Sequence, residues 1–292
     1  MENGHISIYG MAEKECVDRK NLPQCIKEAM ASAKPNPIQS LQAIIAIPEE
    51  ESFIKVIRLP KQDPKETKKS IEQEIGKLLP YAPEEMYWDW RLIEKDSKNN
   101  SYDEVMVEAA TKKTIDSYIE TVSQTGLEPI IIETEANALI WGSIDPFTPG
   151  RVEPTIVLNI GATKITTAIF ANGAIPFTAS FKKDAADQKD FISDVILEPI
   201  AKKLKEYIEY YNDLSATREK ESTNRIQSVI ITGESGISQA MLSSLEKKLS
   251  LPIKRPAKII PIEPYCAIAS GLALRALTEN EPPASKLVAI HL

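Results

Sequence analysis

The chain has 292 residues, of which 42% are hydrophobic and 26% charged, and its formal net charge is -7 at pH 7. This length and balance predict a folded protein with room for two domains, and they argue against wholesale disorder. The negative charge also argues against a protein that binds a nucleic-acid backbone, because that function needs a basic face. Nucleic acid is therefore not an expected partner.

The three cysteines, Cys16, Cys25 and Cys266, form no Cys-x-x-Cys pair and no Cys/His cluster. They predict unpaired thiols in a reducing compartment rather than a disulfide framework or a zinc site. The N-terminus lacks the pattern of a signal peptide, and no apolar run approaches the ~20 residues of a membrane-spanning helix. We expect a cytoplasmic protein without direct membrane insertion, so that any association with a membrane would come through a partner.

The first 110 residues predict a strand and a helix followed by a small α+β module. His5 to Met11 begins as a short strand, and Asn21 and Pro23 are typical of the start of a helix that ends near Lys34. The module over 41–110 reads strand, strand, helix, strand, strand. Its strands are expected over 41–47, 52–59, 81–93 and 105–110, and its helix over 65–79.

An aromatic row marks the third strand of this module. Met86, Trp88, Trp90 and Leu92 share one strand face. Such a row could be a recognition surface, but burial against the preceding helix is the better interpretation. A helix over 111–124, a buried strand over 128–132 and a second helix from Glu133 follow.

Turn-forming residues concentrate over 145–154 and predict a junction between two halves. Directly after it, the stretch from Thr155 to Gly173 predicts two strands joined by a tight small-residue turn and followed by an Asn172-Gly173 hairpin turn. A turn of glycine and small residues lets backbone N–H groups converge on a phosphate, although an ordinary β-meander has the same pattern.

The second half continues with a helix over 187–212, which Pro199 is expected to kink or restart, and a solvated loop over 215–225. A buried strand from Gln227 is then followed by a Gly/Ser turn and a helix over 238–249, and helix N-termini favour phosphate groups. The small residues of a helix over 264–277 allow close packing against another element. Residues 286–292 are a candidate last strand.

Together these segments resemble the actin-like ATPase superfamily. Within this superfamily, their order and their residues resemble the type IV pilus assembly protein PilM family. The resemblance covers nearly the whole chain, and the linked series is far more specific than any single segment. The segments that carry it are 54–60, 79–90, 109–118, 125–129, 133–139, 159–162 and 231–233.

The resemblance implies an α/β, actin-like (ribonuclease H-like) two-lobed fold with an inserted small α+β subdomain, similar to the SHS2 or 1C subdomain of the cell-division protein FtsA. The first lobe would comprise 1–40 and 111–145, the inserted subdomain 41–110 and the second lobe 155–261. Residues 262–292 would form a helix that returns to the first lobe, and a tail.

The resemblance also implies a site for ATP with Mg²⁺. Its second phosphate loop would contain Asn159, Gly161, Ala162 and Thr163, and its adenosine loop would contain Thr232, Gly233, Glu234, Ser235 and Gly236. Glu135 stands where the superfamily places an acid that orients the metal and the attacking water. An acidic residue that complements the helix dipole is an equally good interpretation of Glu135.

Three departures from the family predict that this site is degenerate. Asn159 stands where the family has the Asp that holds metal-bound water, and Glu234 and Ser235 replace two glycines of the adenosine loop. The family's first phosphate hairpin, an Asp-x-Gly turn between two strands, would precede His5 and is lacking. A truncated start and a degenerate member of the family are the two interpretations.

The resemblance therefore implies a cytoplasmic component of the type IV pilus, or a related type II secretion-like, inner-membrane assembly platform, which is not an efficient ATPase on its own. Its expected partner is the cytoplasmic N-terminal peptide of a PilN-like membrane protein. The pilus motor ATPase and a second copy of the chain are further candidate partners.

Two alternative functions stay open. An actin-fold sugar kinase would share the small-residue phosphate motif, but it needs a catalytic Asp in a Gly-Asp turn, and the chain has no Gly-Asp pair. An FtsA-like filament protein would end in a basic amphipathic membrane helix, and residues 287–292 are too short and too apolar for one.

Overall fold

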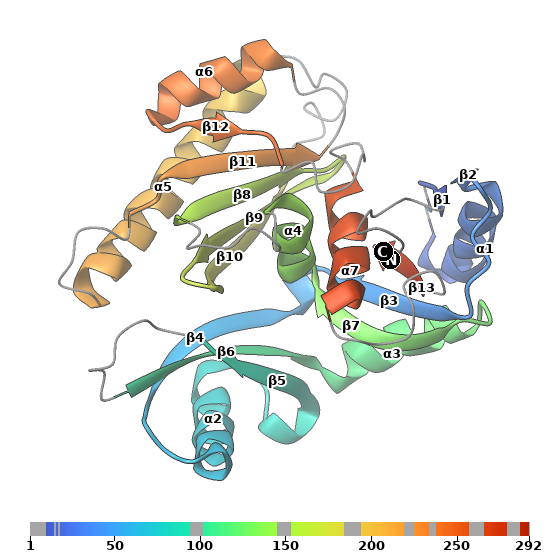
Figure 1. Ribbon diagram of the computed structural model, residues 1–292, viewed down its shortest axis with the longest axis horizontal. Coiled ribbons are helices and arrows are strands. Elements are labelled where there is room, and N and C mark those ends of the chain that lie inside the picture. The colour runs from blue at the N-terminus through green and yellow to red at the C-terminus, as the bar shows by residue number, and fades with distance from the viewer. Residues whose placement is uncertain are drawn as a thin grey trace.

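The computed structural model describes residues 10–14, 16, 18–93, 102–144, 153–183, 194–218, 225–233, 238–256, 266–278 and 287–291. The described strands form four sheets, and two of these sheets lie on either side of the helices α4 (Glu135–Ser143) and α7 (Ala267–Thr278), as Figure 1 shows. Buried apolar side chains of both helices and both sheets make one hydrophobic core. The two sheets and the helix pair between them form the body of the molecule.

The first of these sheets is parallel, and β3 lies at its centre. Its strand order is β13 (Leu287–His291), β3 (Gln42–Ile47) and β7 (Glu128–Thr134). The helices on its outer face are α1 (Leu22–Ser32) and α3 (Lys112–Ser123). Ile44 and Ala46 belong to the core around α4 and α7, whereas Ile45 and Ile47 pack with α1 and α3. Because both faces of β3 are covered, its sequence is apolar almost throughout.

The second sheet combines parallel and antiparallel strands. Its order is β10 (Ala174–Lys182), β9 (Lys164–Ala171), β8 (Thr155–Ile160), β11 (Ser228–Gly233) and β12 (Ile253–Lys254). Its outer face packs with α5 (Asp194–Arg218) and α6 (Gln239–Leu249). Val157 belongs to the core around α4 and α7, whereas Ile156 and Leu158 pack with α5 and α6. This alternation is the two-residue period of a strand with both faces covered.

Asn172 and Gly173 form the turn between β9 and β10. Their φ angles are 52° and 76°. Positive φ at both central positions is the geometry of the type I′ hairpin turn, for which Asn-Gly is a favoured sequence. The hairpin predicted there is confirmed.

The third sheet belongs to the small α+β module. Its strands are antiparallel in the order β4 (Phe53–Pro60), β6 (Tyr102–Thr111) and β5 (Met86–Leu92), and α2 (Pro64–Leu78) packs against one face. Trp88 and Trp90 are partly buried against the cluster that contains Ile71 and Ile75 of α2. The prediction that the aromatic row packs on the helix is confirmed for these two residues, whereas Leu92 is 51% exposed.

One strand was expected in this module and lies elsewhere. The sequence predicts that residues 41–47 join the module over 41–110, but β3 pairs with β7 and β13, and the module's sheet contains β4, β6 and β5. That expectation is wrong, because a strand whose two faces are both buried suits the centre of a parallel sheet covered by helices. The remaining boundaries of the lobes and of the inserted subdomain stay predictions.

The helices α4 and α7 pack at backbone distance. A Cβ atom at Gly271 would lie 1.8 Å from the carbonyl oxygen of Ala138, and one at Gly142 would lie 1.9 Å from the carbonyl oxygen of Ala267. The prediction that small residues let the last helix approach another element closely is confirmed. The structure identifies that element as α4.

The helix α5 differs from its predicted extent. Pro199 lies inside it, so the helix does not restart there, and it includes residues 215–218 of the predicted loop. Ile200 and Leu204 are buried in the core against β8 and β9, which holds the helix on the sheet beyond the proline. Residues 187–193 of the predicted helix lie outside the described residues, as does most of the predicted junction over 145–154.

The segment before α1 folds back onto this helix. It contains β1 (Gly10–Met11) and η1 (Arg19–Asn21), and β1 pairs with β2 (Lys34–Pro35) beyond the other end of α1. Cys16 and Cys25 form a disulfide, with their Cα atoms 6.1 Å apart. The prediction that these two cysteines are unpaired thiols is therefore wrong, because the chain reversal brings them together without a spacing motif. The start of the predicted first strand at His5 lies outside the described residues.

Short 3₁₀ turns complete the described elements. They are η2 (Glu49–Glu51), between β3 and β4, and η3 (Pro83–Glu85), before β5. None of the described helices combines the length and the apolar character that crossing a membrane requires.

Candidate functional site

The predicted phosphate turn joins β8 to β9. The backbone N–H of Gly161 donates to the carbonyl oxygen of Lys164 at 2.9 Å, and Ala162 and Thr163 are exposed. A Cβ atom at Gly161 would lie 3.1 Å from the same carbonyl oxygen, which is tighter than an ordinary contact. The structure thus contains the tight small-residue turn that the sequence predicts at this position.

Lys183 holds this turn from the end of β10. Its backbone N–H donates to the carbonyl oxygen of Thr163 at 2.9 Å, and its ammonium donates to the carbonyl oxygen of Gly161 at 3.0 Å. The residue is 6% exposed, which is unusual for a lysine. Lys183 therefore fixes the shape of the turn and places a positive charge beside it.

The second predicted loop begins beside the first. The strands β8 and β11 are parallel, with Asn159 opposite Thr232 and Ile160 opposite Gly233, so both end at the same edge of the sheet. Gly233 has a φ of 110°, and a Cβ atom there would lie 2.2 Å from the carbonyl oxygen of Ile160. Only glycine fits this strand end. The remaining predicted residues of this loop, Glu234, Ser235 and Gly236, lie outside the described residues.

A row of polar residues crosses the sheet at this edge. Asn159 lies opposite Thr166 of β9 and Thr232 of β11, so the three side chains share one face of the sheet. Val157 and Ala168, two residues further along the strands, belong to the core around α4 and α7. The polar row therefore lies on the face toward these helices, where Glu135 begins α4.

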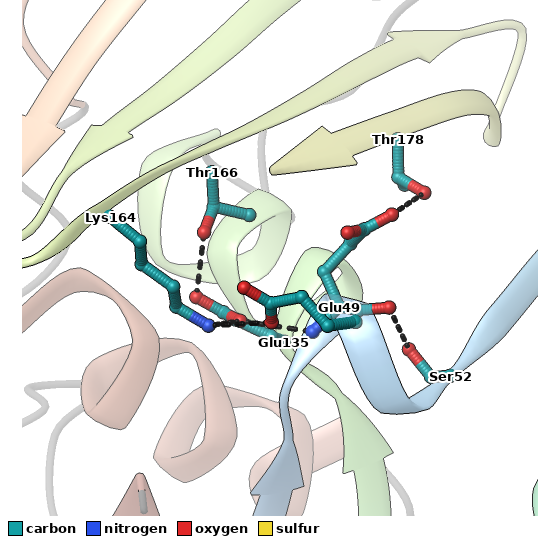
Figure 2. A network of polar contacts seen from close by, with 7 residues as sticks. Glu49, Ser52, Glu135, Lys164, Thr166 and Thr178 are labelled. Atoms are coloured by element: carbon teal, nitrogen blue, oxygen red, sulfur yellow. Dashed lines mark hydrogen bonds and ion pairs between the residues drawn. The ribbon is translucent and has the colours of Figure 1, made fainter. Parts of the chain in front are cut away.

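Glu135 is fully buried and joins three parts of the chain. Its Oε1 accepts a hydrogen bond from Thr166 Oγ1 at 2.9 Å, and its Oε2 accepts from Lys164 Nζ at 2.8 Å and from the backbone N–H of Glu49 at 3.1 Å (Figure 2). Thr166 and Lys164 come from β9, and Glu49 comes from η2. The carboxylate thus links α4 to the second sheet and to the segment that leads into the small module.

Lys164 lies between two carboxylates. Its Nζ is 2.8 Å from Glu135 Oε2 and 3.0 Å from Glu50 Oε2. Burial by itself would lower the pKa of the Lys164 ammonium, but the attraction and hydrogen bonds of Glu135 and Glu50 outweigh burial and raise this pKa above its ordinary value. Lys164 is therefore charged at neutral pH.

The segment η2 also contacts β10. Oε1 of Glu49 accepts a hydrogen bond from Thr178 Oγ1 at 3.0 Å, and Ser52 Oγ donates to the carbonyl oxygen of Glu49 at 3.4 Å (Figure 2). The residues that connect the first sheet to the third are thereby held against the second sheet.

These side chains do not fit a bound Mg²⁺. This ion needs near-octahedral oxygen ligands at about 2.0–2.1 Å, usually several waters, one or two carboxylates and, in ATPases, the phosphates of the substrate. Here Glu135 is engaged by an ammonium group, and residue 159 is a neutral amide. Within the described parts of the chain, no group of three or more His, Cys, Asp or Glu side chains could hold a metal ion. The position of Glu135 as the first residue of α4 agrees with the alternative interpretation, an acid that complements the helix dipole.

Sequence reasoning missed Lys164, Lys183 and Glu49. Lys164 directly follows the predicted turn, so a search for cations next to that turn would have singled it out. Nothing local relates it to Glu135, which is 29 residues away, or relates Glu135 to Glu49, which is 86 residues away. Acidic residues between two strands are typical of a solvated loop.

The two sheets, the helix pair between them and the two turns at one sheet edge define a protein with an actin-like ATPase fold. The family described as type IV pilus assembly protein PilM matches residues 6–182. Because this match spans more than half of the chain, the chain belongs to the PilM family.

Solved structures share this fold. The chain is similar to the structure titled PilM-PilN type IV pilus biogenesis complex, with a TM-score of 0.70 and 16% identity over 95% of this chain and 90% of that chain. It is also similar to the ethanolamine utilization protein EutJ from Carboxydothermus hydrogenoformans, with a TM-score of 0.51 and 14% identity over 88% of this chain and 75% of that chain. At these identities the likeness shows the fold. A comparison with curated proteins gives no match.

Proposed function

We propose that this chain is the actin-like component of the inner-membrane platform that assembles type IV pili, and that it binds the cytoplasmic N-terminal peptide of a PilN-like membrane protein. The observation that carries the proposal is the PilM family match over residues 6–182. The likeness in fold to the solved PilM-PilN complex, over 95% of this chain, supports it. In this role the protein works in the cytoplasm and reaches the membrane through its partner.

We further propose that the ATP site is degenerate and that the protein is not an efficient ATPase on its own. Three features support this. Asn159 supplies no charge for metal-bound water, Glu135 is paired with Lys164, and Lys183 donates to a carbonyl oxygen of the phosphate turn. The tight turn at Gly161 and the glycine strand end at Gly233 support weak nucleotide binding, which is compatible with the proposal.

The partner is tested by titrating the purified chain into a fluorescently labelled peptide that comprises the cytoplasmic N-terminus of the neighbouring PilN-like protein. We expect saturable binding in fluorescence anisotropy, and none for a scrambled peptide of the same composition. Equal response to both peptides, or no binding at high micromolar concentration, would contradict the proposed partner.

The nucleotide site is tested by isothermal titration of ATP with and without Mg²⁺, comparing the unmodified chain with Asn159→Asp. We expect weak binding by the unmodified chain and a modest Mg²⁺-dependent gain in the variant, because a carboxylate restores one acidic group for metal-bound water. Tight Mg²⁺-dependent binding by the unmodified chain would refute the degenerate site.

A further inference from the structure

The strongest unexplained feature of the site is a lysine ammonium among carboxylates, one of which is Glu135, the residue for which the resemblance to actin-like ATPases implies a role beside a metal. We infer that the Lys164 ammonium takes the place of the divalent cation beside Glu135, and that Glu135 consequently joins α4 to the second sheet and to η2 instead of orienting a metal and water. This inference rests on the degenerate ATP site in the proposed function, and it names the group that excludes the metal.

The first argument is the state of the Glu135 carboxylate. It is fully buried, and both of its oxygens accept hydrogen bonds, from Thr166 on one side and from Lys164 and the backbone of Glu49 on the other. A buried carboxylate requires a positive partner and hydrogen-bond donors. Lys164 supplies both within the chain, so Glu135 needs no metal to be stable where it lies.

The second argument is the geometry around the ammonium. Nζ of Lys164 lies 2.8 Å from an oxygen of Glu135 and 3.0 Å from an oxygen of Glu50. These are the distances of charge-assisted hydrogen bonds, and they bring two carboxylates to one cation. A divalent ion between the same oxygens would collide with this ammonium, so either cation excludes the other.

The third argument is where the lysine is anchored. Lys164 is the first residue of β9, and its carbonyl oxygen accepts the hydrogen bond that closes the phosphate turn at Gly161. Its backbone is therefore fixed by the turn itself, while its side chain reaches the start of α4. The positive charge stays beside the turn whenever the turn is formed.

The consequence is a contact shared by three segments that are far apart in the chain. Glu135 begins α4, Lys164 and Thr166 belong to β9, and Glu49 belongs to η2 (Figure 2). Glu50, the second carboxylate partner of Lys164, also belongs to η2. A metal would bind and leave with nucleotide, whereas Lys164 is part of the chain and stays beside Glu135. The arrangement of α4, the second sheet and η2 is therefore expected not to depend on metal or nucleotide.

The test uses metal alone, without nucleotide or peptide, on the full chain and on Lys164→Met. The variant keeps the unbranched apolar stem of the side chain but removes the ammonium group, which leaves the carboxylates of Glu135 and Glu50 without their shared cation. We expect millimolar Mg²⁺ or Mn²⁺ to raise the melting temperature of Lys164→Met by several degrees and to leave that of the unmodified chain unchanged. The affinity for Mn²⁺, measured by electron paramagnetic resonance, should be at least about tenfold higher in the variant.

The matched control is Lys182→Met. Lys182 lies directly opposite Lys164 on β10 and is exposed, so its loss changes the net charge equally and leaves the Glu135 contact intact. We expect no metal response in this control. If Lys164→Met fails to fold, Lys164→Gln, which retains a hydrogen-bond donor, provides the same comparison.

A metal response in the unmodified chain would overturn the inference, and so would its absence in both Lys164 variants. Neither result depends on peptide binding, so failure of this inference is distinguishable from failure of the proposed partner. Tight Mg²⁺-dependent ATP binding by the unmodified chain would instead refute the degenerate site on which the inference rests.

Discussion

Glu135 and Glu50 bind the same lysine in different surroundings. Glu135 is fully buried, whereas the side chain of Glu50 is 45% exposed. Removal of one partner from a buried ion pair leaves an uncompensated charge, whereas an exposed ion pair is weakened by water and by side-chain entropy. The two glutamates should therefore differ strongly in their contribution to stability.

We predict that Glu135→Ala lowers the free energy of unfolding by about 3 kcal/mol, because Lys164, Thr166 and the backbone of Glu49 lose their common acceptor. Glu50→Ala should cost less than about 1 kcal/mol. Urea unfolding at neutral pH, followed by circular dichroism, measures both. Similar losses of stability in the two variants would show that burial does not increase the contribution of the Glu135 ion pair.

At the scale of elements, the contact between α4 and α7 depends on the absence of side chains. A Cβ atom at Gly271 would lie only 1.8 Å from the carbonyl oxygen of Ala138. Because this oxygen belongs to the helix backbone, it cannot easily move aside. Gly76 of α2 offers a contrast, because a Cβ atom there would meet a side-chain atom of Pro83 at 3.5 Å, an ordinary contact.

We predict opposite effects for the same substitution at these two helix positions. Gly271→Ala should destabilise the protein by roughly 3 kcal/mol, because the added methyl group forces α4 and α7 apart. Gly76→Ala should stabilise it by about 0.5–1 kcal/mol, because alanine restricts the unfolded chain and favours the helix. Thermal unfolding of both variants tests this, and a stable Gly271→Ala protein would contradict the close packing of α4 and α7.

At the scale of the whole molecule, a second buried polar cluster joins the small module to the body. Oε1 of Glu108, on β6, accepts hydrogen bonds from Asn137 Nδ2 at 2.5 Å and from Thr134 Oγ1 at 3.0 Å. Asn137 Nδ2 also donates to Glu133 Oε1 at 2.9 Å, and Glu133 Oε2 lies 3.3 Å from Arg275 Nε. A strand of the module is thereby tied to β7 and α4.

Protonation of Glu108 should affect the stability that this contact between the module and the body contributes to the folded protein. Burial, and next the negative charge of Glu133, raise the pKa of Glu108 from its ordinary value of 4.5 to about 7, although Thr134, Arg91 and Asn137 act in the opposite direction. Because the folded protein holds this proton more tightly than the unfolded chain does, the stability due to Glu108 is fully present below about pH 4.5 and is lost as the pH rises to about 7.

We predict that Glu108→Gln removes this pH dependence, because the amide keeps an acceptor for Asn137 and Thr134 but cannot ionise. Relative to the variant, the unmodified chain should lose about 3 kcal/mol of stability between pH 4.5 and pH 8. Urea unfolding across this range measures the difference. The control is Glu84→Gln at an exposed position, which should show the same pH dependence of stability as the unmodified chain. If the free energy of unfolding of Glu108→Gln changes with pH as steeply as that of the unmodified chain, the raised pKa of Glu108 is contradicted.

The local features of this protein were predictable because their signals are local. Asn172-Gly173 predicts its hairpin through turn chemistry, the alternation of β8 and β9 follows the strand period, and the glycines and alanines of α7 predict close packing. The tight turn at Gly161 and the strand end at Gly233 were also recognisable as turns, since each places glycine where a strand stops, and their role in binding phosphate stays a prediction.

Long-range pairing was decided by the tertiary structure. The apolar sequence of β3 indicates burial on both faces but does not say which strands lie beside it, so its place next to β7 and β13 was missed. The disulfide between Cys16 and Cys25 depends on a chain reversal. The pairing of Glu135 with Lys164 depends on how α4 packs against the second sheet, because electrostatic partners are chosen by the packing of elements and not by sequence spacing. The sequence by itself determined most of the elements, the turns and the family, whereas packing determined that the Glu135 carboxylate binds Lys164, Thr166 and the backbone of Glu49.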